Sequence, residues 1–235
     1  MLSPASLPHS VCRVSRVPVW EWPNWAYAGS DGTFGNRFDD PESLYRVLYA
    51  SASMYGCYLE TLARFRPDLA LYAELRSIDG DAEDSIEPGV VPWTWRRERC
   101  VGWASASGKY ADILSTESIA FLRTELASTV IQLGFPDLDA SALHSTAPRV
   151  LTQRVSRIAF EGDFDGIFYQ SKYGNDIHNY AIFEGRVFFQ DEMESSIAAD
   201  DEELLRALAV HDLILEPSTE PIPARIRGIV RGPRA

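Results

Sequence analysis

The stretch that decides the fold is NRFDDPESLYRVLYASASMYGCYLETLARFRP, residues 36–67. Within it, residues 46–50 (RVLYA) form a short run rich in strand-forming side chains. Ser51 or Ser53 then offers an N-cap for a helix that Pro67 closes. The stretch therefore predicts a strand followed directly by a helix.

One face of the expected helix is apolar. Its members recur at helical spacing, so we expect them to face the core: Met54, Tyr58, Leu62 and Phe65. One long helix over residues 41–66 is an alternative that the local pattern leaves open.

Glu60 lies on another face of that helix. Its neighbours three and four positions away are mainly small: Gly56, Cys57, Ala63 and Arg64. One interpretation is a surface glutamate that pairs with Arg64 at i,i+4, which stabilises a helix by a few tenths of a kcal/mol. The other is that the small neighbours leave space for a ligand beside the carboxylate.

Strands and helices are interspersed along the rest of the chain. The patterns predict strands over residues 11–20, 93–106, 109–114, 166–171, 179–184 and 186–190, and helices over 115–134, 147–160 and 199–210. Short strands and tight turns favour a mixed α+β domain over a doubly wound parallel sheet. No GxGxxG follows a strand and no GxxxxGK[ST] occurs, which excludes the Rossmann and P-loop patterns.

We expect one domain over residues 1–215 and a tail over 216–235. The tail is rich in proline and carries four arginines, so it is expected to pack poorly or to lie over the surface as a strap. These arginines are Arg225, Arg227, Arg231 and Arg234.

Charge and cysteine content restrict the possible function. Asp and Glu outnumber Lys and Arg by 34 to 22 in 235 residues, for a net charge of −12. This charge argues against direct nucleic-acid binding, which needs a basic face, and against an anionic membrane surface. Three widely spaced cysteines without a CxxC pair, and four scattered histidines, indicate neither a metal site nor a disulfide framework. No signal peptide or membrane-spanning run is visible, so a cytoplasmic protein is the expectation.

Several polar residues are candidates for a binding site. Arg37 follows a glycine-containing loop; by itself it reads as solvated or paired with an aspartate, yet its guanidinium fork also suits a phosphate or diphosphate. Arg13 and Arg16, on the first expected strand, could add charge to the same pocket. Ser171 begins a polar loop and no GxSxG surrounds it, so most simply it organises a turn.

Taken together, two blocks resemble the signature blocks of RES domains. They are RFDDP…VLYASASMYGCYLETL, from residue 37 to 62, and GIFYQSKYGNDIHNYAIF, residues 166–183. That family is named for an Arg, a Glu and a Ser, which fall here on Arg37, Glu60 and Ser171. Tyr49, eleven residues before Glu60, takes the tyrosine position of the family. The resemblance spans residues 11 to 190.

The sequence departs from the family pattern at two places. The segment between Arg37 and Tyr49 is about one residue longer than expected, which makes Arg46 the fallback for the arginine. The family often has two glycines after the serine, where this chain has only Gly174.

The resemblance implies a fold like that of ADP-ribosyltransferases, with two small, mostly antiparallel sheets flanking an NAD cleft and with surrounding helices. It implies a toxin of a bacterial toxin–antitoxin pair that degrades NAD by hydrolysis or phosphorolysis, with inorganic phosphate as a possible co-substrate and no metal. A protein ADP-ribosyltransferase with the same site is the first alternative, and a non-catalytic binding module is the second. The implied partner is an antitoxin, commonly of the helix-turn-helix type, which plugs the cleft.

The resemblance also implies roles for individual residues. Arg37, Glu60 and Ser171 are the expected catalytic residues, and Glu60 is expected to stabilise the cation-like ribose that forms when neutral nicotinamide leaves. The expected substrate-binding residues are Tyr49, Arg13, Arg16 and Asn179.

Overall fold

The computed structural model describes residues 1–5, 10–70, 73, 88–145, 147–218 and the backbone of 226–228. Its main feature is a nine-stranded sheet. In order across this sheet the strands are β1 (Ser3–Pro4), β6 (Tyr110–Asp112), β7 (Gly166–Ser171), β8 (Gly174–Phe183), β3 (Val47–Ser51), β2 (Val11–Ser15), β5 (Cys100–Ser105), β9 (Gln190–Ser196) and β11 (Ile226–Gly228). Neighbouring strands are antiparallel, except β6 and β7. A second sheet pairs β4 (Gly89–Val91) with β10 (Leu213–Leu215) in parallel.

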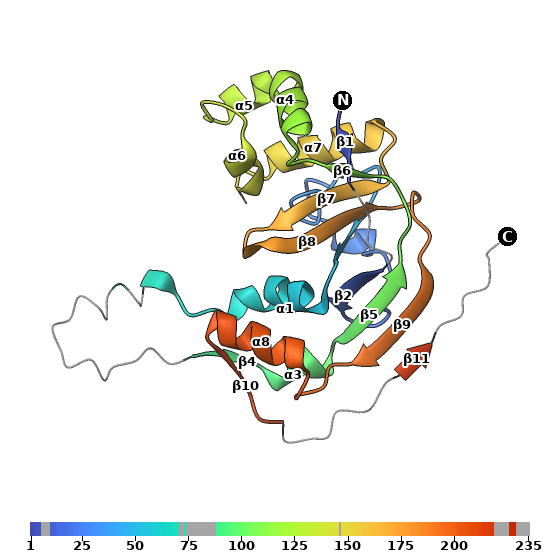
Figure 1. Ribbon diagram of the computed structural model, residues 1–235, viewed down its shortest axis with the longest axis vertical. Coiled ribbons are helices and arrows are strands. Elements are labelled where there is room, and N and C mark those ends of the chain that lie inside the picture. The colour runs from blue at the N-terminus through green and yellow to red at the C-terminus, as the bar shows by residue number, and fades with distance from the viewer. Residues whose placement is uncertain (6–9, 71–72, 74–87, 146, 219–225, 229–235) are drawn as a thin grey trace.

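The helices form two groups over the curved sheet (Figure 1). The upper group is α4 (Thr116–Glu125), α5 (Ala127–Gln132), α6 (Ala140–His144) and α7 (Val150–Glu161), and the lower group is α1 (Met54–Leu62), α3 (Trp93–Arg97) and α8 (Glu202–His211). Two short 3-10 helices are η1 (Trp25–Tyr27) and η2 (Ala63–Phe65). The α+β class expected from the sequence is confirmed.

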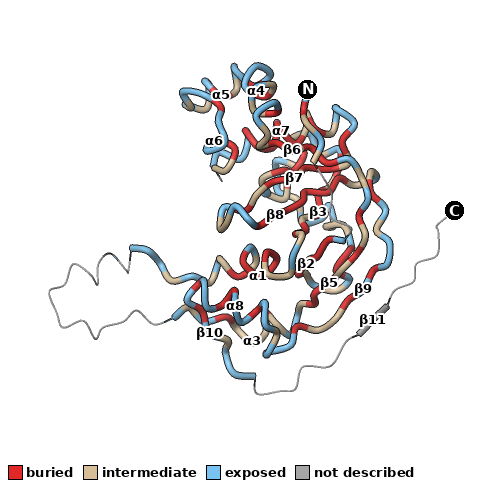
Figure 2. Tube along the Cα trace, in the orientation of Figure 1, coloured by how far each residue is buried: buried red, intermediate tan, exposed pale blue. Residues whose placement is uncertain are grey.

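Each helical group covers its own core, and a third core lies on the other face of β8 from the upper one. Figure 2 shows buried residues along both the sheet and the helices. Alternation along β8 shows how one strand serves two cores, because successive side chains point to opposite faces of a sheet. Phe183 and Ala181 pack under the upper helices, whereas Ile182 and Tyr180 pack in the third core. Ile177, further back on β8, packs with the core under α1 and α8.

The stretch 36–67 folds as a strand and a helix. The Oγ of Ser53 accepts a hydrogen bond from the amide N of Gly56 at 3.1 Å and so caps α1, as expected of an N-cap serine. The alternative of one helix over residues 41–66 is wrong, because residues 47–51 pair with β8. The apolar face expected on the helix packs into the core that α1 shares with α8.

The two halves of the large sheet are joined by a single residue pair, Cys12 with Ser51. On either side of this junction β3 pairs with β8, and β2 with β5, over five residue pairs each. The prediction of two small sheets therefore differs from the structure, which has one large sheet and a two-stranded one. The physical reason is that β2 and β3 do meet, but only briefly, before they diverge.

Several other segments differ from the sequence-based expectation. The strand expected over 11–20 ends at Ser15, and the helix expected over 115–134 is divided into α4 and α5 at Leu126. Residues 93–106 were expected as strand; Trp93–Arg97 instead form α3, which follows Pro92, and only Cys100–Ser105 form β5. The strand expected over 186–190 begins only at Gln190, as β9. In residues 93–97 and 186–189, aromatic side chains favour a strand locally, but whether a strand forms depends on backbone pairing with a neighbouring strand.

In the tail, residues 226–228 pair with β9 as β11. The rest of the expected tail beyond residue 218, with Arg225, Arg231 and Arg234, lies outside the described residues. None of the described helices is long and apolar enough to cross a membrane.

Candidate active site

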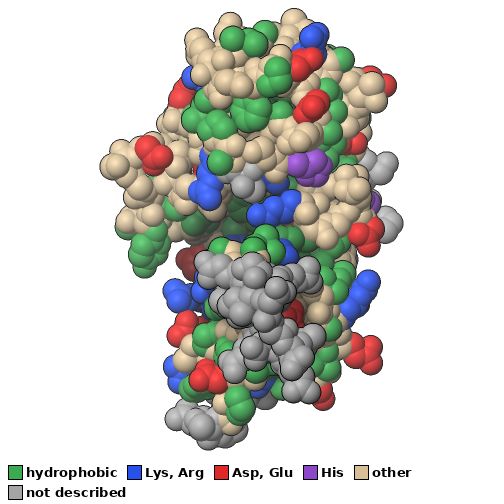
Figure 3. Space-filling view, turned by 90° about the vertical axis from the view of Figure 1, so that its left-hand side faces the viewer, with side chains coloured by type: hydrophobic (Ala, Val, Ile, Leu, Met, Phe, Trp, Pro, Cys, Tyr) green, Lys and Arg blue, Asp and Glu red, His purple; other side chains and the backbone are tan. Residues whose placement is uncertain are grey.

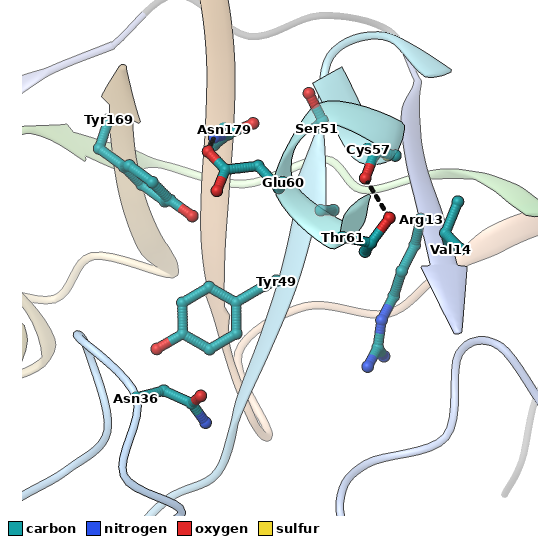
Figure 4. A pocket seen from close by; sticks show the side chains of 11 residues that line it. Arg13, Val14, Asn36, Tyr49, Ser51, Cys57, Glu60, Thr61, Tyr169 and Asn179 are labelled. Atoms are coloured by element: carbon teal, nitrogen blue, oxygen red, sulfur yellow. Dashed lines mark hydrogen bonds between the residues drawn. The ribbon is translucent and has the colours of Figure 1, made fainter. Parts of the chain in front are cut away.

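A pocket of about 370 Å³ lies where β2 and β3 diverge at the centre of the large sheet. Side chains from β2, β3, α1, β7, β8 and the loop before Arg37 line it. Four of the predicted site residues are among them: Arg13, Tyr49, Glu60 and Asn179 (Figure 4). The volume is at the lower end of the roughly 300–1,000 Å³ that small-molecule pockets occupy.

Glu60 projects from α1 beside Asn179 of β8. Its Oε1 accepts a hydrogen bond from the Nδ2 of Asn179 at 2.8 Å, across 119 positions of sequence. No ion pair joins Glu60 to Arg64, although both are described, and the guanidinium of Arg64 lies over the Phe65 ring at 4.8 Å. The i,i+4 surface pair considered from the sequence is therefore not formed. Glu60 remains an exposed carboxylate that a buried amide orients.

Gly56, one turn before Glu60, allows α1 to approach the sheet closely. A Cβ at this position would stand 2.8 Å from Cγ2 of Ile177 and would also clash with the Oγ of Ser51. Since no larger residue fits, glycine brings the helix against β3 and β8. This approach is what places the Glu60 carboxylate within reach of Asn179.

Two tyrosines face the same pocket, Tyr49 from β3 and Tyr169 from β7. The Tyr49 hydroxyl accepts a hydrogen bond from the amide N of Phe38 at 2.9 Å. Burial raises the pKa of both phenols, and the nearby charges of Asp39 for Tyr49 and of Glu60 for Tyr169 raise it further. Both phenols therefore stay protonated at neutral pH and are able to donate hydrogen bonds.

Arg13 supplies positive charge to the pocket, while Arg16 does not. The Nη1 of Arg13 donates to the carbonyl of Val19 at 3.0 Å, and burial lowers the pKa of its guanidinium to about 10, so it remains a cation at neutral pH. Arg16 follows the last residue of β2, and its side chain is 73% exposed in an ion pair of 3.1 Å with Glu98. The structure does not bring Arg16 to the pocket, because the chain has left the strand there.

Arg37 lies next to the pocket but does not line it. Its Nη2 donates to the carbonyl of Leu143 in α6 at 2.6 Å, and its guanidinium carbon stands 5.2 Å from the centre of the Tyr169 ring. The fallback, Arg46, pairs instead with Glu184 and donates to the carbonyl of Pro23.

Ser171 also lies outside the pocket lining. It is 1% exposed at the end of β7, and its Oγ accepts a hydrogen bond from the amide N of Tyr173 at 3.0 Å. Through this hydrogen bond Ser171 orders the turn between β7 and β8.

Sequence reasoning missed four polar residues of the pocket: Asn36, Ser51, Thr61 and Tyr169. For Tyr169 a signal was present, because it lies only two positions before the candidate Ser171 on the same strand. For Ser51 the signal was hidden, because only the register of β3 with β8 sets it opposite Asn179.

The charge near this site is opposite in sign to the net charge of the chain. On the face shown in Figure 3, Lys and Arg side chains gather in the middle of the molecule, between the two helical groups, although the net charge is −12. An anionic ligand is attracted to such a local positive region. Across the described residues no group of three or more His, Cys, Asp or Glu side chains is placed to hold a metal ion.

A family model described as the RES domain matches residues 10–206. A chain of the crystal structure of the M. tuberculosis MbcT–MbcA toxin–antitoxin complex aligns with 12% identity and a TM-score of 0.44, over 81% of this chain and 86% of that chain. A comparison with curated proteins gave no match.

Proposed function

The chain belongs to the RES domain family, and from this premise we propose that it cleaves the bond between nicotinamide and ribose in NAD. Toxins of this family are typically NAD-degrading enzymes. The proposal covers hydrolysis and phosphorolysis, which break the same bond and differ in the acceptor.

The observation that carries the proposal is the Glu60 carboxylate, held by Asn179 at 2.8 Å on the wall of the pocket. When nicotinamide leaves NAD as a neutral molecule, positive charge develops on the ribose. A fixed carboxylate beside that sugar stabilises the developing charge more than it stabilises the ground state. Because Asn179 already orients the carboxylate, little reorganisation is needed when the reaction occurs.

The other residues of the pocket suit the remaining parts of NAD. Arg13 is a cation that can bind the diphosphate, and Tyr49 can contact the nicotinamide riboside. Arg37 and Ser171 contact residues near the pocket without lining it. Arg37 packs on Tyr169, and Ser171 orders the β7–β8 turn. We therefore assign the direct catalytic role to Glu60 and positioning roles to Arg37 and Ser171.

Purified protein is expected to consume NAD and release an equimolar amount of nicotinamide without added metal. Chromatography of the products, with and without inorganic phosphate, distinguishes ADP-ribose from its phosphorylated form. Transfer of ADP-ribose to added cell proteins would indicate the ADP-ribosyltransferase alternative. Intact NAD after long incubation with folded protein and phosphate would contradict the proposal, and NAD binding without turnover would support a binding module.

Expression of the chain alone in a bacterial host is expected to lower cellular NAD and arrest growth, because NAD cleavage in the cytoplasm removes a shared cofactor. We propose that an antitoxin, of the helix-turn-helix type common for the family, relieves the arrest; with a net charge of −12, DNA contact is assigned to that partner. Growth curves and NAD assays test this, with the Glu60→Gln variant as the control. Normal growth with abundant active protein would contradict the toxin role.

A further inference from the structure

Tyr169 carries a polar group that the fold leaves unused. The residue is 8% exposed and lines the pocket, and its hydroxyl makes no hydrogen bond with any residue that the structure describes. Figure 4 shows this hydroxyl pointing into the space between Glu60 and Tyr49. The Tyr49 hydroxyl, by contrast, is bonded to the Phe38 amide. This hydroxyl opens into the pocket and is not among the sealed polar atoms of the core, so it is available to donate a hydrogen bond to a ligand there.

Two side chains that also contact each other, Phe38 and Arg37, pack against the ring of Tyr169. The Phe38 ring packs on it at 4.9 Å between centres with a tilt of 54°, and the Arg37 guanidinium lies 5.2 Å from its centre. This second distance is within the roughly 6 Å over which a cation attracts an aromatic face. The hydroxyl is thus held in one place before any ligand arrives, and a preorganised donor binds with little loss of entropy.

The position of the hydroxyl is also set relative to Glu60. Tyr169 on β7 pairs directly with Asn179 on β8, and the amide of Asn179 donates to Glu60. Asn179 therefore lies beside Tyr169 in the sheet and holds the acceptor carboxylate through its side chain. Burial, and after it the charge of Glu60, raises the pKa of the Tyr169 phenol, so the donor keeps its proton.

We propose that Tyr169 determines substrate specificity by donating a hydrogen bond to one hydroxyl oxygen of the nicotinamide ribose, while a second hydroxyl of that ribose donates to Glu60. A vicinal diol offers an acceptor oxygen and a donor O–H side by side, which matches the neighbouring phenol and carboxylate. This inference rests on the proposed NAD cleavage. It also gives Arg37, which does not line the pocket, a positioning role through its contact with the Tyr169 ring.

Tyr169→Phe tests the proposal because it removes the hydroxyl and keeps the ring that packs on Arg37 and Phe38. We expect kcat/KM for NAD to fall roughly 3- to 10-fold, as for the loss of one neutral hydrogen bond, with an unchanged melting temperature. Tyr173→Phe is the matched control, because Tyr173 is a half-buried tyrosine outside the pocket lining, and its activity should equal that of the wild type.

Two NAD analogues, lacking either the 2′- or the 3′-hydroxyl of the nicotinamide ribose, separate recognition from general damage. On the analogue that lacks the contacted hydroxyl, wild type and Tyr169→Phe should react equally fast; on the other the difference should persist. An unchanged Tyr169→Phe, or an equal penalty on both analogues, would overturn the assignment while NAD cleavage stands. If wild type binds NAD without turnover, the same comparisons are made on Kd. Protein that neither binds nor cleaves NAD would overturn both proposals.

Discussion

Glu60→Gln is expected to lower the rate of NAD cleavage about 10²–10³-fold, the typical cost of removing one preorganised electrostatic contact from a transition state. Gln has nearly the same shape as Glu, and its amide oxygen can still accept the hydrogen bond from Asn179. The change therefore removes charge and little else. NAD binding should weaken much less than turnover, because the positive charge on the ribose develops only in the transition state.

Thermal melting and NAD turnover on the same preparations check this expectation. Glu60 is exposed and forms no ion pair with Arg64, so the free energy of unfolding should change by no more than about 0.5 kcal/mol. Glu125→Gln is the control, since Glu125 is an exposed glutamate of α4, a helix that contributes no residue to the pocket lining. A folded Glu60→Gln protein with near-wild-type turnover would show that this carboxylate is an ordinary surface charge.

The local part of the fold was predictable because its signals are local. A serine cap, an apolar face and a closing proline specify α1, and strand-forming residues specify β3. The small neighbours of Glu60 were interpreted as space for a ligand; in the structure one of them, Gly56, lets α1 approach the sheet closely. What the sequence could not indicate is the buried amide that orients Glu60, because that contact depends on how a distant strand is paired.

The contacts of the arginines also could not be predicted from the sequence around them. Arg37 and Arg16 are both flexible cations in polar surroundings, and nothing near them in the sequence distinguishes their targets. Arg37 donates a hydrogen bond to the carbonyl of Leu143, which is 106 positions away in the sequence. Arg16 donates a hydrogen bond to Glu98, which is 82 positions away, at the surface. Long side chains choose among partners that only the folded chain brings near, so their roles were the least predictable part of the site.

Local sequence patterns also could not predict whether the strands form one large sheet or two smaller ones. Short strands with tight turns predicted a mixed α+β domain, and the resemblance to RES domains implied mostly antiparallel pairing, which the structure has. Whether β2 and β3 belong to one sheet depends on the single pair Cys12–Ser51. The same brief contact creates the pocket, because strands that pair over their whole length would leave no opening between Arg13 and Tyr49.

Asn179→Leu is expected to separate stability from activity. Asn179 is 1% exposed, and its Oδ1 is buried without a hydrogen-bond partner in the part of the chain that the structure describes. An unpartnered buried polar atom destabilises a fold by about 1–3 kcal/mol, so an apolar side chain of similar shape should leave the melting temperature unchanged or raise it. Without the Nδ2 donor, however, the Glu60 carboxylate is free to move. A displacement of about 1 Å can cost about 10²-fold in rate, so kcat should fall by roughly 10- to 100-fold.

Asn175→Leu is the matched control, because it places the same substitution on an exposed position of the same strand and should leave turnover unchanged. The two variants are compared by thermal melting and by kcat and KM for NAD. A stable Asn179→Leu protein with wild-type kcat would show that Glu60 needs no orientation by the amide. A marked loss of stability would show instead that the amide supports the fold, and that the buried Oδ1 finds a partner in solution. Only the combination of unchanged or raised stability with lowered kcat fits an asparagine whose amide serves the carboxylate rather than the core.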